Sequence, residues 1–271
     1  MIESNITRRG VIGHSLVGAS LVTTAMSEQI IGAARAQAAP KTFVLVHGAW
    51  HGGWCWRGVA DQLQAKGHKV YAPTLTGLGE RSHLMSALIT LDTHITDVAN
   101  VIMWEDLDNI VLVGHSYAGF VISGVAERAL HSIGSIVFVD AFLPDNGQRV
   151  VDLRPDLKAA TLAAAGKNEV SRPIPPAKLF GVNEKDQPWV DGKMTPQPTL
   201  VWLQSIALSG ARDKVPKKTY IRATAYASAI FEMHFQTLKS DRSWRTYGVP
   251  CGHDIMVDMP DRLVEILLEV A

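Results

Sequence analysis

Residues 109–124 read NIVLVGHSYAGFVISG and join an apolar run to a run of small and apolar residues. The first run, Ile110 to Val113, has the length and composition of a strand that is buried on both faces. The second run has the composition of a helix. One serine, Ser116, stands between them, so the stretch predicts a sharp strand-to-helix turn that exposes a hydroxyl group at the end of a sheet.

Small residues are needed near this turn, because the strand and the helix approach each other closely there. Gly114 and Ala118 are small enough, and Gly119 adds further room. Ala118 stands where the pattern G-x-S-x-G has its second glycine, and we expect its extra methyl group to be tolerated. Ser116 could merely cap a helix, but the preceding strand favours a nucleophile.

Short apolar runs alternate with helical patterns along the chain after Pro40. This alternation is typical of an α/β protein with a mostly parallel central sheet flanked by helices. We expect strands at 42–46, 69–72, 110–113, 136–139, 219–222 and 244–247, and helices at 56–66, 94–104, 116–131 and 260–270.

The alternation stops between residues 146 and 215, where prolines cluster and no clear strand is found. Helical pieces are expected around 157–165 and 199–211. A segment of about 70 residues is too long for a plain loop in a compact domain. We therefore predict one α/β domain over 39–271 with a helical cap inserted at about 146–215.

The first 38 residues have a different character. Arg8 and Arg9 lie in TRRGVI, a mildly apolar stretch follows, and the AQA of residues 36–38 offers a cleavage site. This order is typical of a twin-arginine export signal, with a disordered or membrane-resting helix as the alternative. We expect a periplasmic or secreted enzyme with no stable membrane insertion after the signal is removed.

The amino-acid composition limits the kinds of partner and cofactor that we expect the protein to bind. The formal net charge is zero and no basic stripe is present, so nucleic acid is not an expected partner. The two cysteines, Cys55 and Cys251, lack the C-x-x-C spacing of metal or redox sites. Two free, buried thiols are favoured, although an exported protein could pair them. No cofactor or metal is implied, and the oligomeric state is open.

A serine nucleophile needs an imidazole that accepts and returns its proton. His253 follows the last expected strand and precedes the last expected helix, as the chain order serine, acid, histidine requires. His51 is expected to be structural or at most to line the substrate site.

The acid has two candidates. Asp140 directly follows the strand at 136–139, and a carboxylate buried there would need a partner such as an imidazole N–H. Glu232 is the alternative acid. The turn after 219–222, a common place for the acid in this fold, contains no carboxylate. Asp254 adjoins His253 and is expected to point elsewhere.

Acyl transfer also needs two backbone N–H donors for the developing oxyanion. The amide of Tyr117, directly after the nucleophile, is one candidate. The amide of Ala49, in the glycine-containing turn after the first strand, is the other. We expect the side chain of His47 to hold this turn by hydrogen bonding rather than to take part in the chemistry.

The chain resembles the esterase and hydroxynitrile lyase branch of the α/β-hydrolase superfamily, which includes plant methylesterases and small bacterial carboxylesterases. The resemblance rests on FVLVHGAWHGGWCW at 43–56, GHKVYAPTLTGLGERSHL at 67–84, GHSYAG at 114–119, MTPQP at 194–198 and GHD at 252–254. It implies the α/β-hydrolase fold and a small-molecule ester substrate.

Two positions depart from that branch. Its cyanide-handling members carry a lysine after the catalytic histidine and a threonine in the first loop, where this chain has Asp254 and Gly48. Its plant members place the acid where Ala225 and its neighbours stand. Cyanohydrin cleavage is therefore disfavoured, and Asp140 depends on the spacing argument alone.

The sequence predicts a serine carboxylesterase that hydrolyses small apolar or aryl esters through an acyl-enzyme. One alternative is a lyase or C–C bond hydrolase that uses the same Ser116, His253 and Asp140. Another is a non-catalytic ligand receptor with this fold.

Overall fold

Six parallel strands form the centre of the computed structural model, which describes residues 39–271. Their order across the sheet is β2-β1-β3-β4-β7-β8, so the strand before Ser116 lies near the middle. The strands are β1 (Thr42–Val46), β2 (Lys69–Tyr71), β3 (Ile110–His115), β4 (Ile133–Val139), β7 (Lys217–Ala223) and β8 (Trp244–Val249).

Burial explains why the central strands have continuous apolar sequences. Every residue of β3 is buried, whereas the edge strands β2 and β8 are partly exposed. A strand covered on both faces needs apolar side chains on both. The predicted fold class, a mostly parallel sheet flanked by helices, is confirmed.

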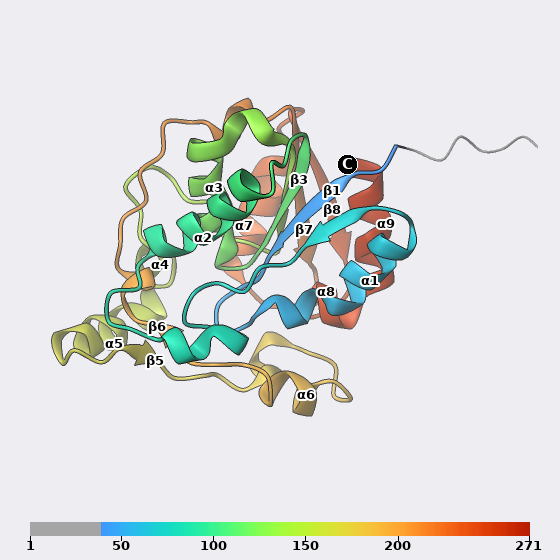
Figure 1. The fold of residues 1–271 in the computed structure, drawn as a ribbon. Helices are drawn as coiled ribbons and strands as arrows, with labels where there is room; N and C mark the ends of the chain where they lie inside the picture. The colour runs from blue at the N-terminus through green and yellow to red at the C-terminus, as the bar shows by residue number, and fades with distance from the viewer. Residues whose placement is uncertain (1–38) are drawn as a thin grey trace, which may run out of the picture. The chain divides into compact units, whose positions relative to one another are not determined.

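Helices cover both faces of the sheet (Figure 1). Apolar residues of α1 and α9 pack with one face in one buried cluster, and residues of α2, α3 and α7 pack with the other face in a second cluster. The helices are α1 (Arg57–Ala65), α2 (Leu91–Trp104), α3 (Ala118–Ala129), α7 (Ala229–Lys239), α8 (Ile255–Asp258) and α9 (Pro260–Val270). Helix α7 was not among the expected elements.

The segment between β4 and β7 contains α4 (Val150–Leu153), α5 (Pro155–Gly166) and α6 (Gln187–Asp191). It also contains a two-residue antiparallel ribbon, β5 (Ser171–Arg172) with β6 (Gln197–Pro198), which the sequence did not indicate. Its backbone is tied to the loop after β1, where the amide of Thr195 donates to the carbonyl of Trp50 (2.9 Å). This segment therefore lies against a strand end that the candidate site uses.

The helix expected at 199–211 is wrong. Only one short 3-10 turn forms there, at Leu200–Trp202, and a second follows at Arg212–Lys214. The Gln204 amide still donates to the carbonyl four residues earlier, that of Leu200 (3.2 Å), but several later amides donate to other parts of the chain. Ile206 N–H donates to the Gln148 carbonyl (2.9 Å), and Ser209 N–H to the Glu127 carboxylate (2.9 Å). Tertiary hydrogen bonds have replaced the helical ones.

The remaining predictions concern the two cysteines, membrane insertion and the export signal. Cys55 and Cys251 are both free and buried. Within residues 39–271, no helix is long and apolar enough to cross a membrane. The predicted export signal and its cleavage site lie outside the described residues and stay predictions.

The packing around the turn at Ser116 shows at which position a side chain larger than glycine does not fit. A Cβ atom added at Gly119 would lie 1.9 Å from the Phe142 carbonyl oxygen, because the first turn of α3 presses on the segment after β4. Ala118 is fully buried and its methyl group is accommodated. Gly119, rather than position 118, is where glycine is required for close approach.

We therefore expect Gly119→Ala to lower the free energy of unfolding by about 3 kcal/mol, at the upper end of the cost of overpacking. Ala118→Gly should retain the fold. Gly166→Ala is the matched control, since an added Cβ atom meets nothing within 4 Å there. Thermal and urea unfolding would measure all three, and equal stabilities of Gly119→Ala and Gly166→Ala would contradict this interpretation.

Candidate active site

Backbone strain marks the ends of three neighbouring strands. Trp50, Ser116 and Asp140 follow β1, β3 and β4 and have positive φ angles of 65°, 54° and 42°. Positive φ is unfavourable for residues other than glycine and clusters at functional sites. The remaining non-glycine residues with positive φ are all Asp or Asn, which tolerate this conformation better.

Ser116 occupies the turn between β3 and α3, and hydrogen bonds fix its backbone. Its amide donates to the Val139 carbonyl (3.2 Å), and its carbonyl accepts from the amides of Gly119 (3.0 Å) and Phe142 (3.1 Å). The half-buried side chain therefore stands on a turn that is bonded to both neighbouring segments.

The loop after β1 lies against this turn. A Cβ atom added at Gly48 would lie 3.0 Å from the Cβ atom of Ser116, so glycine permits the contact. Neither the Ala49 amide nor the Tyr117 amide donates to another group among the residues that the structure describes. Both amides are thus free to bind an anionic oxygen near Ser116.

His47 holds the peptide group that carries the Ala49 amide. Its Nε2 accepts from the Leu75 amide (3.0 Å), so its Nδ1 carries the proton and donates to the Gly48 carbonyl (2.8 Å). Burial lowers the pKa of His47 to about 3, which keeps the ring neutral at neutral pH. The structure thus places His47 in a supporting position, as the sequence analysis expected.

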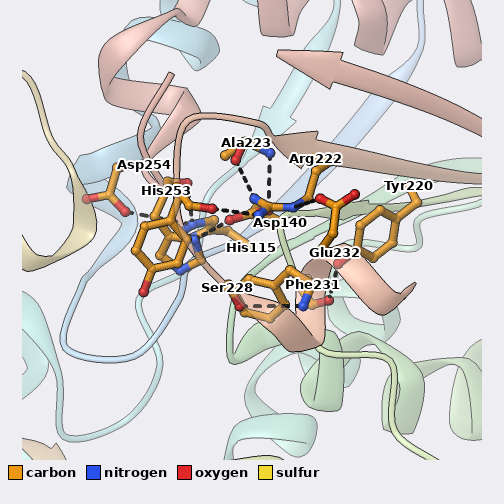
Figure 2. Close-up of polar contacts among 12 residues, drawn as sticks. His115, Asp140, Tyr220, Arg222, Ala223, Ser228, Phe231, Glu232, His253 and Asp254 are labelled. Atoms are coloured by element: carbon orange, nitrogen blue, oxygen red, sulfur yellow. Dashed lines mark hydrogen bonds and ion pairs between the residues drawn. The ribbon is translucent and has the colours of Figure 1, made fainter. Parts of the chain in front are cut away.

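His253 and Asp140 come together at the carboxyl end of the sheet (Figure 2). The Nδ1 atom of His253 lies 2.6 Å from Oδ2 of Asp140, and both side chains are buried. The backbone amide of His253 also donates to the Phe180 carbonyl (2.8 Å), which connects the histidine loop to the inserted segment. A carboxylate at this distance fixes the orientation of the imidazole.

Aromatic rings enclose His253. The ring of Phe231 lies nearly parallel to it at 5.4 Å between centroids, and that of Tyr226 lies at 4.6 Å. Ser228 caps α7 by accepting from the Phe231 amide (3.4 Å), which helps to place that ring. These rings limit the movement of the imidazole.

The alternative acid, Glu232, is not brought to His253. It lies on α7, its side chain is 48% exposed, and its Oε2 is 3.3 Å from Nε of Arg222. Arg222 in turn contacts Asp140, so both Arg222 and Asp140 stand between Glu232 and His253 in this chain of contacts (Figure 2).

A second buried His–Asp pair lies beside the first. Nε2 of His51 is 3.0 Å from Oδ2 of Asp254, and Nδ1 of His51 is 2.8 Å from the Ala49 carbonyl. The Ala49 carbonyl accepts hydrogen bonds, and so does the Asp254 carboxylate, whose lowered pKa keeps it ionised. Both ring nitrogens of His51 therefore donate, and His51 is an imidazolium ion. The ion pair joins the loop of Ala49 to the loop of His253. As expected, Asp254 does not serve as the partner of His253.

The pKa values in this pair move in opposite directions. Burial would lower the pKa of His51, but the charge and hydrogen bond of Asp254 raise it above the ordinary value. Burial would raise the pKa of Asp254, but the nearby His51 lowers it. Neighbouring His115 donates through Nε2 to the His253 carbonyl (3.0 Å), and burial holds its pKa well below the ordinary value. The site therefore contains one charged supporting histidine, His51, and two neutral ones, His47 and His115.

A cavity of about 410 Å³ adjoins the site. Phe180 and Tyr226, whose rings pack on His253, form part of its wall, and Trp50 follows the candidate oxyanion residue Ala49. Trp202 packs against Trp50 at 5.3 Å between ring centroids. Aromatic rings thus form the part of the wall beside the candidate base, and prolines, aliphatic side chains and the charged residues Arg154, Asp156 and Arg172 form most of the rest. Ser116 and His253 do not themselves line the cavity.

No metal site accompanies these residues. Among residues 39–271, no group of three or more His, Cys, Asp or Glu side chains is arranged to hold a metal ion. The sequence predicted Ser116, His253 and Asp140 as the site residues, and it gave no expectation for Arg222 and His115, which the structure places beside them. The signal for Arg222 was a cation at the end of the apolar strand TYIR at 219–222, where a buried charge requires a carboxylate.

Comparisons with known proteins identify the family of the chain. The sequence profile of the alpha/beta hydrolase family matches residues 43–266. A carbendazim hydrolyzing esterase from Nocardioides sp. (strain SG-4G) is 41% identical over 236 residues, which cover 83% of this chain and 97% of that protein.

More distant relatives match in part or in structure. Methylesterase 7 of Arabidopsis thaliana is 38% identical over 107 residues, which cover 39% of this chain and 41% of that protein. The solved structure of an extracellular alpha/beta-hydrolase from a Paenibacillus species superposes with a TM-score of 0.74 at 25% identity, covering 86% of this chain and 99% of that one.

The His51–Asp254 pair predicts a pH-dependent loss of stability. Removal of one partner of a buried ion pair typically costs about 3–5 kcal/mol, so Asp254→Asn should lower the free energy of unfolding by about that amount. Because folding lowers the pKa of Asp254, its ionised form stabilises the fold at pH values above the pKa of the unfolded chain, and this stabilisation is lost as the pH falls. Because folding raises the pKa of His51, its protonated form stabilises the fold at pH values below the pKa of the unfolded chain, and this stabilisation is lost as the pH rises.

The difference in the free energy of unfolding between the wild type and Asp254→Asn should therefore be largest at roughly pH 4–6.5, between the ordinary pKa values of Asp and His. Urea unfolding across this range would measure it. Glu265→Gln is the control, because the Arg262–Glu265 pair is exposed. A small difference that does not vary with pH would disprove the buried ion pair.

Proposed function

The chain belongs to the alpha/beta hydrolase family and is a carboxylic ester hydrolase, and we propose that it cleaves esters through an acyl-enzyme formed on Ser116. His253 acts as the general base, and Asp140 orients its ring. The observation that carries this proposal is the 2.6 Å contact between His253 and Asp140 beside the strained turn of Ser116.

The reaction proceeds in two steps. His253 removes the proton of the Ser116 hydroxyl as its oxygen attacks the ester carbonyl, and then gives the proton to the leaving alcohol. Water then attacks the acyl-enzyme as His253 removes its proton, and the imidazolium ion returns that proton to the Ser116 oxygen as the bond to the acyl group breaks and the acid is released. Asp140 stabilises the imidazolium ion that forms in each step and fixes the tautomer of the resting ring.

The amides of Ala49 and Tyr117 bind the oxyanion that develops on the carbonyl oxygen. A donor of this kind is typically worth about 3 kcal/mol of transition-state stabilisation. Two features support the assignment: both amides lack another acceptor in the described part of the chain, and His47 fixes the peptide group of the first.

Substitution of each acid distinguishes Asp140 from Glu232. We expect Ser116→Ala to abolish p-nitrophenyl ester hydrolysis and Asp140→Asn to lower kcat by about 10³–10⁴-fold, as in other triads. Glu232→Gln should have a small effect, because the side chain is half-exposed and does not contact His253. Steady-state kinetics would measure this. A larger loss in Glu232→Gln than in Asp140→Asn, or undiminished activity of Ser116→Ala, would overturn the proposal.

The substrate is a small apolar or aryl carboxylic ester. The four aromatic residues in the wall of the 410 Å³ cavity, Trp50, Phe180, Trp202 and Tyr226, support this choice, because flat rings pack well against aromatic side chains. Asp254 supports hydrolysis over cyanohydrin cleavage, since it is committed to His51 at the position where a lysine would be needed.

Ring preference should depend on Trp202. We expect kcat/KM to be about tenfold higher for methyl benzoate than for methyl cyclohexanecarboxylate, the upper value for an aromatic pair. Trp202→Leu should reduce this ratio, whereas Trp104→Leu, whose side chain is 76% exposed, should not. Chromatography of the products would measure both, and equal ratios in all three proteins would exclude the aromatic pocket. Release of aldehyde or ketone instead of acid would favour a lyase.

A further inference from the structure

Arg222 is a buried cation at the end of a buried strand. It is the last but one residue of β7 and is only 3% exposed. Strand β7 runs parallel to β4, and Ile221 pairs with Val139, so Arg222 lies beside Asp140 at the same edge of the sheet. Burial of a guanidinium ion is costly unless charges and acceptors satisfy it.

The Asp140 carboxylate divides its two oxygens between different partners. Oδ1 accepts from Nη1 of Arg222 (2.8 Å) and from the Ala223 amide (3.1 Å), while Oδ2 accepts from His253 (2.6 Å). Two donors from β7 thus hold one oxygen, and the other is left for the imidazole (Figure 2). The carboxylate cannot rotate without breaking both bonds to β7.

Arg222 also closes the loop that follows β7. Its guanidinium donates to the carbonyls of Ala223 and Tyr226. The Tyr226 ring stacks on His253. Arg222 therefore reaches the candidate base by two routes, through the carboxylate and through the loop that carries the aromatic ring.

We propose that Arg222 is a positioning residue of this site, which locks the Asp140 carboxylate onto His253 and shares its negative charge. This inference rests on the proposed roles of Asp140 and His253. The loop after β7 holds no acid, and it supplies instead the donors that anchor an acid from the neighbouring strand.

Charge sharing separates this role from simple structural support. With Arg222 present, Asp140 belongs to an ion pair and stabilises the imidazolium ion of His253 less than a lone carboxylate would. Loss of the guanidinium charge should therefore favour the protonated, inactive base at a given pH. The other titratable or charged groups around Asp140 and His253 are Glu232 on α7, His115 at the end of β3, Tyr220 on β7, Tyr226, Cys251, His51, Asp254 and Arg154.

The test compares Arg222→Met, Arg222→Lys and the wild type across pH 5–10 with a p-nitrophenyl ester. In Arg222→Met we expect kcat to fall about 10²-fold, the cost of a misplacement of about 1 Å, with KM little changed. The acidic limb of the kcat/KM profile should move to higher pH. Arg222→Lys keeps the charge but loses the planar fork, so its acidic limb should stay at the wild-type pH while kcat falls less.

Arg245→Met is the matched control, because Arg245 is an exposed arginine on the adjacent strand β8, and it should behave as the wild type. Thermal unfolding identifies a variant that fails to fold. If Arg222→Met does not fold, Arg222→Lys decides: a reduced kcat with an unmoved acidic limb supports the proposal, and an unchanged kcat overturns it. A folded Arg222→Met with an unmoved acidic limb also overturns it.

Asp140→Asn separates this inference from the proposed function. If Asp140→Asn stays active, the proposed function of Asp140 fails. If Asp140→Asn is inactive while Arg222→Met has the wild-type kcat, only the role of Arg222 fails.

Discussion

The buried carboxylate of Asp140 is the interaction on which the rest of the site depends. A negative charge with no exposure at the end of an apolar strand is tolerated only when donors surround it. Here the donors come from β7, through Arg222 and Ala223, and from the loop after β8, through His253. Three neighbouring strands of the sheet, β4, β7 and β8, are thereby connected at one carboxylate.

The parallel sheet makes this convergence possible. All six strands run in the same direction, so the loops after β1, β3, β4, β7 and β8 emerge at one edge. Positive φ angles at Trp50, Ser116 and Asp140 turn the chain sharply there, and Gly119 lets the first turn of α3 press on the segment after β4. Strain at these three turns is sustained by the packed strands beneath them.

Two buried ion pairs lie at this edge of the sheet and contact different loops. The Asp140 carboxylate of the pair with Arg222 contacts the ring of His253, whereas the pair of Asp254 with His51 joins the histidine loop to the loop of Ala49. Neither pair is exposed, so neither is screened by solvent or salt to the extent of a surface pair. The adjacent residues His253 and Asp254 therefore belong to two separate networks.

The sequence by itself determined the parallel sheet and predicted Ser116 as nucleophile and His253 as base, because apolar runs and the order of serine and histidine are local signals. It also favoured Asp140 over Glu232 from spacing, and the structure brings that residue to His253. Only the tertiary structure decided that Arg222 supports Asp140, that His51 is charged, and that residues 199–211 give up helical bonds. These features depend on contacts between residues far apart in the chain, which local periodicity and propensity do not encode.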